Sequence, residues 1–136
     1  MSGNEGAGCR VLVVEDDMLI AVAIEEVLHA LNCQVVGPAA SLEKALKLAQ
    51  GESFDVAILD VTIRGGKVHP VAELLLARGI PFVFASGYGD WALPEALRDQ
   101  PRLMKPFTVT ELEEQIKLLC SAAKAAQRLV SRDAKA

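Results

Sequence analysis

Acidic, hydroxyl and ammonium side chains follow four apolar runs of this 136-residue sequence. The set comprises Glu15, Asp16 and Asp17 after residues 11–14, Asp60 after 56–59, Ser86 after 82–85, and Lys105 after 102–104. Carboxylates brought together repel one another, and a divalent cation with oxygen ligands, such as Mg²⁺, removes that repulsion. We expect Asp17 and Asp60 to be direct ligands and Asp16 to bind directly or through water. The backbone carbonyl of Thr62 offers another oxygen, and Glu15 is the weakest candidate.

These residue types also suit phosphoryl transfer. Asp60 can attack a phosphoryl donor as a carboxylate nucleophile. Such transfer depends on positioning and on stabilising the charge of the phosphoryl oxygens. Lys105 can pair with one of these oxygens and the Ser86 hydroxyl can donate to another. Gly87, which has no side chain, leaves room beside the phosphoryl group.

The elements that must position these residues alternate between strand and helix. Runs 11–14, 56–59 and 82–85 are apolar throughout and indicate strands buried on both faces, while 33–37 and 102–104 suit edge strands. Helical periodicity covers 20–31, 41–49, 68–75 and 108–130, and residues 88–98 favour only a short or irregular helix. This order predicts an α/β fold, the flavodoxin-like (βα)5 doubly wound parallel sheet of five strands in the order 2-1-3-4-5. Ligands of such sheets bind beyond the carboxyl ends of the strands, where all six polar residues lie.

Each polar stretch is weak when taken alone. Acidic residues after a strand are often helix N-caps, and Ser86-Gly87 and Lys105-Pro106 are common in turns and loops. Their joint occurrence at four strand ends favours a functional site.

Composition excludes several classes of protein. Hydrophobic residues make up 51% of the chain and charged residues 24%, so a core can form. The net charge of −4 and the lack of any Lys/Arg cluster argue against binding to nucleic acid or an anionic membrane. Cys9, Cys33 and Cys120 are odd in number and irregularly spaced, so we interpret them as small buried hydrophobic residues in a reducing compartment. The first eight residues lack signal-peptide features, and we expect a cytoplasmic protein.

The residues match a known family. The sequence Val-Val-Glu15-Asp16-Asp17, with Ile-Leu-Asp60, Phe-Ala-Ser86-Gly and Lys105-Pro106-Phe107, resembles the receiver domain of two-component response regulators over residues 10–119. The resemblance implies that Asp60 is phosphorylated, that Asp16 and Asp17 are the acidic pair for Mg²⁺, and that Ser86 and Lys105 contact the phosphoryl group. It also implies a cis Lys105–Pro106 bond. A sensor histidine kinase or a phosphotransfer protein would be the donor.

The stretch 81–89 is similar to the FAT-GUY subgroup of receivers, which are often stand-alone proteins. That similarity implies a signalling domain that acts through protein contacts and catalyses only its own phosphorylation and dephosphorylation. In most receivers an aromatic residue lies three positions before the lysine, but here that residue is Arg102. We therefore expect Tyr88 to be a possible substitute switch.

We expect a flexible tail over residues 1–8, the receiver domain over 9–124 and an extension of the last helix over 125–136. The last helix and strand 5 are a possible homodimer surface. Three alternatives remain: a Mg²⁺-dependent phosphohydrolase, a flavin-binding protein and a receiver fold kept only for binding. Thr62, where a phosphohydrolase usually needs a second carboxylate, argues against the first. The acidic residues Glu15, Asp16 and Asp17 argue against a flavin-binding protein, because they would repel its phosphate. The complete set of site residues argues against a receiver fold kept only for binding.

Overall fold

A computed structural model of the chain describes residues 8–87 and 93–135, with the side chains of the last helix as far as residue 128. The strands are β1 (Arg10–Val14), β2 (Gln34–Ala39), β3 (Val56–Asp60), β4 (Thr62–Ile63), β5 (Gly66–Lys67), β6 (Phe82–Ser86) and β7 (Arg102–Met104). The helices are α1 (Met18–Ala30), α2 (Leu42–Gly51), α3 (His69–Ala77) and α4 (Val109–Lys135), with a 3-10 turn at Glu95–Leu97.

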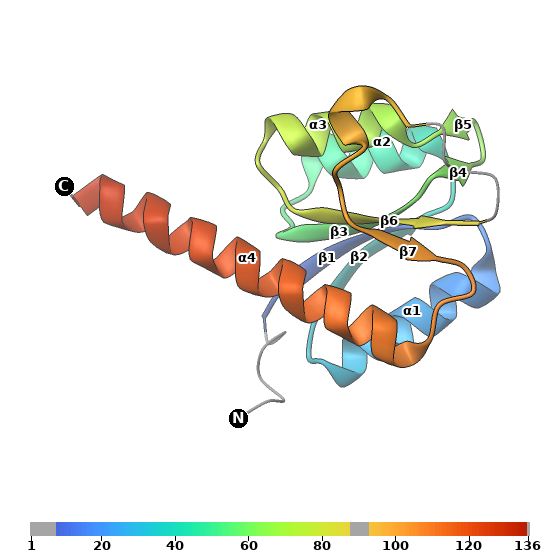
Figure 1. The fold of residues 1–136 in the computed structure, drawn as a ribbon, viewed down its shortest axis with the longest axis horizontal. Coiled ribbons are helices and arrows are strands. Elements are labelled where there is room, and N and C mark those ends of the chain that lie inside the picture. The colour runs from blue at the N-terminus through green and yellow to red at the C-terminus, as the bar shows by residue number, and fades with distance from the viewer. Residues whose placement is uncertain (1–7, 88–92, 136) are drawn as a thin grey trace.

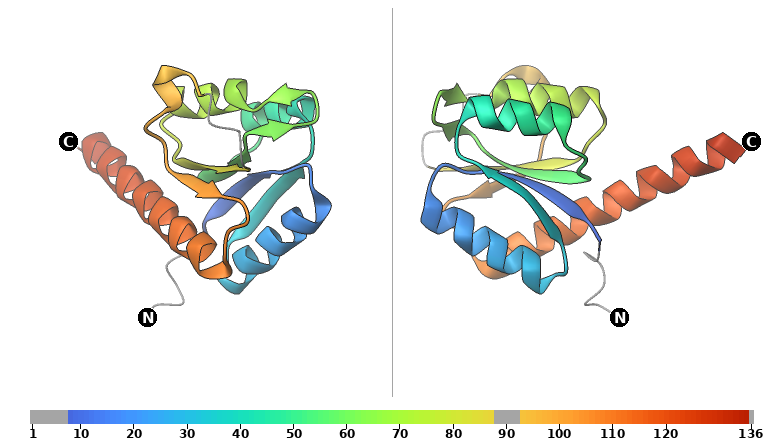
Figure 2. Two further views of the ribbon diagram at one scale, coloured as in Figure 1. Left: turned by 45° about the vertical axis from the view of Figure 1, so that its right-hand side comes forward. Right: turned by 180° about the vertical axis from the view of Figure 1, so that it is seen from behind.

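The main sheet has five parallel strands in the order β2-β1-β3-β6-β7, which confirms the predicted fold and strand order. Helices α1 and α4 cover one face of the sheet, and α2 and α3 cover the other (Figure 1, Figure 2). Strands β3 and β6 are buried at every position because helices pack on both of their faces. The carboxyl ends of the strands therefore meet at one edge of the sheet.

Helix starts are fixed by side chains that accept backbone N–H groups left unpaired at helix ends. Asp17 accepts the amide hydrogens of Leu19 and Ile20 at the start of α1. At the start of α4, Thr108 and Glu111 form a capping box, with N···O distances of 3.1 and 3.3 Å. These caps set where each helix begins relative to the preceding strand.

The segment after Asp60 forms a hairpin, because β4 and β5 pair as antiparallel strands. Gly65 makes its tight turn at a φ of +96°, which few other residues adopt. The hairpin is joined to α2 because the Leu42 amide donates to the Arg64 carbonyl at 2.8 Å.

The cysteines also differ from the prediction. Cys9, just before β1, and Cys120, within α4, form a disulfide with Cα atoms 6.1 Å apart. Cys33 is buried, as expected, and lies outside this disulfide. The disulfide joins residues 111 positions apart, so the spacing of the cysteines along the sequence did not indicate it.

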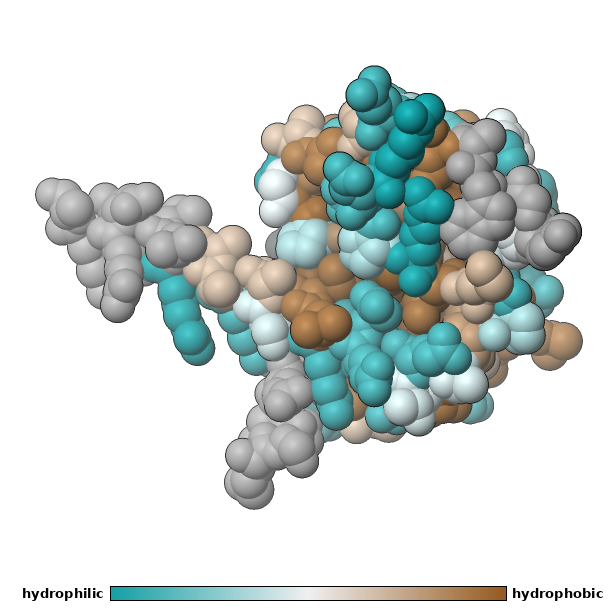
Figure 3. Space-filling view, in the orientation of Figure 1, coloured by the Kyte–Doolittle hydropathy of each residue, from teal (hydrophilic) through white to brown (hydrophobic). Residues whose placement is uncertain are grey.

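The surface mixes hydrophobic and hydrophilic side chains on the side where β7 and α4 lie (Figure 3). Large apolar residues exposed on the molecule include Met18, Leu19 and Val22 of α1, together with Met104 and Leu118. Helix α4 continues well past the body of the domain (Figure 1). None of the helices in the described ranges is long and apolar enough to cross a membrane.

Candidate phosphoryl-acceptor site

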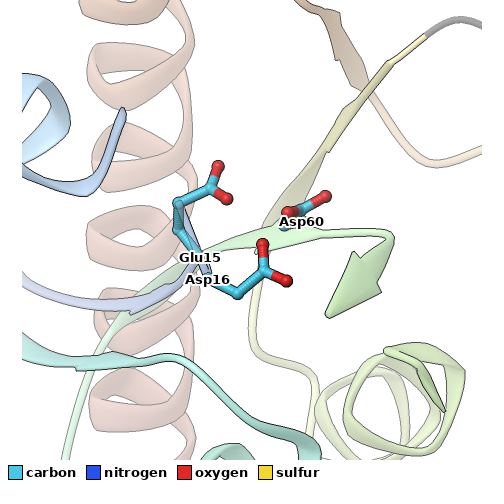
Figure 4. A group of neighbouring side chains, drawn as sticks. All are labelled: Glu15, Asp16 and Asp60. Carbon is cyan, nitrogen blue, oxygen red and sulfur yellow. The ribbon is translucent and has the colours of Figure 1, made fainter. Parts of the chain in front are cut away.

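The predicted polar side chains converge where β1 and β3 end. Ligand oxygens of Glu15, Asp16 and Asp60 all lie within 4.8 Å of one another. Figure 4 shows the three carboxyl groups turned toward a common space, two of them from the end of β1 and one from the end of β3. Glu15 and Asp60 are buried, and Asp16 is half-buried. Clustered carboxylate oxygens of this kind are the ligands that Mg²⁺ takes in proteins.

Lys105 lies beside the cluster and pairs with two of its members. Its Nζ is 2.7 Å from Glu15 Oε1 and 3.2 Å from Asp60 Oδ2. Its position follows from the sheet, because the Lys105 amide donates to the Ser86 carbonyl at 2.8 Å and so continues the pairing of β6 with β7. One lysine offsets only part of the charge of three carboxylates, which leaves a deficit that a cation can fill.

Burial and crowding shift the ionisation of the site. Burial, the hydrogen bond with Glu15 and the repulsion by its charge raise the pKa of Asp60 to about 7, although Lys105 acts in the opposite direction. Burial alone would lower the pKa of Lys105, but its hydrogen bond to Glu15 and the charge of Asp60 raise that pKa overall. Asp60 thus lies in a pocket that disfavours its charge unless further positive charge is supplied.

Ser86 completes the set at the end of β6. Its side chain is buried, and its Oγ has no hydrogen-bond partner among the residues that the structure describes. A buried hydroxyl without a hydrogen-bond partner lowers the stability of the fold, so such a group usually binds a ligand or a water molecule. Gly87 follows directly and is half-buried. An oxygen-rich anion bound at Asp60 would provide the acceptor that Ser86 lacks.

Two acidic residues exchange the roles expected from the sequence. Asp17, expected as a direct ligand, is exposed and lies outside the cluster, because its carboxylate caps α1. Glu15, expected to be the weakest candidate, is within the cluster and accepts the Asp17 amide hydrogen at 3.1 Å. The sequence analysis did not allow for the first residue of α1. Because α1 begins at Met18, the carboxylate of the preceding residue, Asp17, caps the helix.

The structure also places other residues that the sequence analysis singled out. Thr62 is in β4, where its Oγ1 accepts a hydrogen bond from Lys67 Nζ at 2.8 Å. Arg102, which replaces the usual aromatic residue, donates to the Arg98 carbonyl at 3.0 Å. Tyr88, the expected substitute switch, lies outside the described residues. The Lys105–Pro106 bond is cis, as the family resemblance implied.

A parallel sheet of this order with an acidic cluster, a lysine and a hydroxyl at its carboxyl edge defines a phosphoacceptor class of signalling domain. The chain belongs to the response regulator receiver domain family, which matches residues 11–117. Domains of this family act in two-component signalling and are not enzymes in the ordinary sense.

Individual relatives extend this assignment. The chain is 31% identical over 116 residues to the transcriptional regulatory protein PdtaR of Mycobacterium tuberculosis, a match that covers 82% of this chain and 57% of that protein. The chain thus spans little more than half the length of PdtaR. The solution structure of SdrG from Sphingomonas melonis Fr1 matches with a TM-score of 0.70 and 40% identity, over 90% of this chain and 98% of that one. The BeF3-activated conformation of SdrG from Pseudomonas melonis Fr1 matches with a TM-score of 0.68 and 43% identity, over 83% and 98% of the two chains.

Proposed function

We propose that this receiver domain accepts a phosphoryl group on Asp60 from a histidine kinase or phosphotransfer protein, in a reaction that requires Mg²⁺. It then acts as a stand-alone receiver that signals through protein contacts. The observation that carries the proposal is the position of Lys105 Nζ, 3.2 Å from Asp60 Oδ2, at a sheet edge where the buried Ser86 hydroxyl has no hydrogen-bond acceptor among the described residues. The similarity to SdrG, for which a BeF3-activated conformation is known, supports the same function.

In the proposed reaction, an Asp60 carboxylate oxygen forms the new bond to phosphorus as the phosphorus–nitrogen bond of a phosphohistidine breaks. The electron pair remains on the imidazole nitrogen, which takes up a proton from solvent. Lys105 holds a phosphoryl oxygen as a point charge, and Ser86 donates its hydroxyl hydrogen to another.

Glu15, Asp16 and Asp60 are the side chains that would hold Mg²⁺, with the Thr62 backbone carbonyl as a further donor. Their spacing and the excess negative charge beside a single lysine fit this ion. When bound, Mg²⁺ supplies the positive charge that the crowded carboxylates and the phosphoryl oxygens share. Asp17 has a different role, since it fixes the start of α1.

The surface beside Lys105 suits a protein donor. An apolar groove of about 410 Å³ is lined by Leu19, Ile20, Ala23, Lys105, Pro106 and Phe107. Leu19 is 84% exposed, and Met18 and Val22 of the same helix are also exposed. Exposed apolar side chains gathered next to a reactive site indicate a protein contact. We propose that an apolar helical face of the phosphodonor binds here.

The acceptor can be tested by intact-mass analysis after incubation with acetyl phosphate and Mg²⁺. We expect wild type to gain one phosphoryl group, whereas Asp60→Asn and EDTA-treated protein gain none. Asp99→Asn, at an exposed position, is the matched control and should react like wild type. A phosphoryl group retained by Asp60→Asn would place the acceptor elsewhere and overturn the proposal.

The groove can be tested separately by Leu19→Glu. This variant should react normally with acetyl phosphate but slowly with any histidine kinase that phosphorylates wild type. Equal loss with both donors would mean that the residue supports the fold and not the docking of a protein.

A further inference from the structure

The three cysteines, far apart in the sequence, lie in one buried cluster. Cys9 precedes β1 and Cys33 precedes β2, and these strands pair in parallel from Arg10 and Gln34 onward. The Gln34 amide donates to the Cys9 carbonyl at 2.9 Å, so Cys9 and Cys33 occupy neighbouring positions on adjacent strands. Cys120 belongs to the same hydrophobic cluster, on the face of the sheet that α1 and α4 cover. The Cys9–Cys120 disulfide therefore joins helix to sheet with a third sulfur nearby.

A pocket reaches this disulfide. Its volume is about 100 Å³, and it is lined by Gly8, Cys9, Asp55, Cys120, Ala123, Lys124 and Gln127. This volume is enough for about three water molecules. Both cysteines line this space, although Cys9 and Cys120 are only 4% and 0% exposed. A small thiol therefore needs a local opening around this pocket to reach the bond, and not the unfolding of the whole domain.

The pocket also carries a cation suited to thiol chemistry. Lys124 lines it and lies near Cys33, since burial raises the pKa of the Cys33 thiol while the charge of Lys124 lowers it. The charge of Lys124 helps to stabilise a thiolate formed at this pocket, although at Cys33 burial outweighs it and the pKa of that thiol is raised overall.

We propose that Cys9–Cys120 is a reversible redox site, opened by small dithiols through this pocket, that fastens α4 to the start of β1. In the first step a reductant thiolate attacks the Cys9 sulfur, the Cys9–Cys120 bond breaks, and Cys120 leaves as a thiolate and takes up a proton. The second thiol of the reductant then attacks the mixed disulfide and releases Cys9, so that the reductant leaves as a cyclic disulfide. The protein gains two electrons and two protons. Glutathione disulfide restores the bond by the reverse exchange.

Opening the bond acts on the outer half of α4. Past Cys120, the described contacts of this helix with the body include the buried Ala123 and a hydrogen bond from Gln127 Nε2 to Asp55 Oδ1 at 3.1 Å. The disulfide closes a loop between residues 111 positions apart, and cross-links of such length restrict the unfolded chain strongly. The reduced protein therefore has a less stable fold and a more loosely held helix.

The test uses the full chain, first equilibrated with glutathione disulfide and then treated with dithiothreitol under native conditions. Alkylation with N-ethylmaleimide in denaturant, read by intact mass, should give one adduct before reduction and three after it. Amide hydrogens of residues 121–128 should exchange about ten-fold faster after reduction. The Tm should fall by roughly 10 °C.

Two variants separate the proposal from general effects of reductant. Cys33→Ser should keep the whole response to dithiothreitol, with no adduct before reduction and two after it. Cys120→Ser should resemble reduced wild type and should not respond. Three adducts in the oxidised sample, reduction only in denaturant, or unchanged exchange at residues 121–128 would each overturn the proposal.

Discussion

The balance of charge at Asp60 decides how the protein responds to pH. The folded pKa of about 7 exceeds the ordinary value of 3.8, so the folded state binds more protons than the unfolded state between these values. Its free energy of unfolding therefore falls, through this group, as the pH rises from about 4 to about 7. Above that range the ionised carboxylate destabilises the fold, by at most about 4 kcal/mol.

Replacement of this carboxyl should therefore stabilise the protein. Without divalent cations, Asp60→Asn should raise the free energy of unfolding by about 1 to 4 kcal/mol at pH 8, and by less at pH 5. Urea unfolding at the two pH values measures this difference. Asp99→Asn, which removes an exposed carboxyl, should show no such pH-dependent gain. A gain of equal size at both pH values would contradict the assigned shift.

The different roles of two neighbouring carboxylates give a second prediction. Asp16→Asn should abolish most of the rise in Tm that millimolar Mg²⁺ gives wild type, because Asp16 is in the oxygen cluster. Asp17→Asn should preserve this rise, because asparagine caps helices about as well as aspartate. Thermal unfolding with and without Mg²⁺ compares the two variants. The opposite pattern would restore Asp17 as the ligand.

At the scale of elements, α4 depends on the capping box that precedes it. Thr108→Ala removes the acceptor for the Glu111 amide and should cost about 1 kcal/mol of stability. Thr110→Ala, two residues on and also exposed, makes a suitable control and should change stability little. Urea unfolding of both variants gives the comparison. Equal effects would show that the helix does not need its cap.

The sequence predicted the central elements well for a simple reason. Strands such as β3 and β6 are covered by helices on both faces, so each is an unbroken apolar run that few other structures can use. Ser86 and Lys105 follow directly from that frame, because the end of each strand fixes where its next side chain lies. For the segment 88–98, the expected short or irregular helix agrees with a 3-10 turn at Glu95–Leu97 within its described part.

The remaining features depend on contacts between distant residues. Hairpin β4-β5 turns at two glycines and accepts a hydrogen bond from the Leu42 amide, a contact that the local sequence does not reveal. Cys9 and Cys120 meet only once α4 packs against the sheet. The roles of Glu15 and Asp17 depended on the first residue of α1, and helix boundaries are the least certain part of any reading of sequence.

At the scale of the whole molecule, α4 carries charge of opposite sign on its two halves. Glu111 and Glu114 lie near its start and Arg128 lies beyond its middle, with Leu118 between them at 65% exposure. Two copies arranged antiparallel would bring acidic and basic halves together around this leucine. We therefore expect a homodimer through the last helix and the neighbouring edge strand β7, where Met104 is also exposed.

Light scattering coupled to gel filtration measures this association. Phosphorylated wild type should show about twice the monomer mass at concentrations of tens of micromolar, and Leu118→Glu should remain monomeric. Glu26→Gln, on an exposed position of α1, should associate like wild type. A wild type that stays monomeric in both phosphorylation states would exclude the dimer.

The hydrogen bond from the Lys105 amide to the Ser86 carbonyl ties the ends of β6 and β7 into one short unit. An anion bound by the Lys105 ammonium and the Ser86 hydroxyl would therefore pull the ends of both strands in the same direction. A partner protein that distinguishes the occupied site from the empty one would detect this joint movement of the ends of β6 and β7 at the edge of the sheet. Because Ser86 and Lys105 would move together, a partner that contacts one of them would learn nothing more from contact with the other.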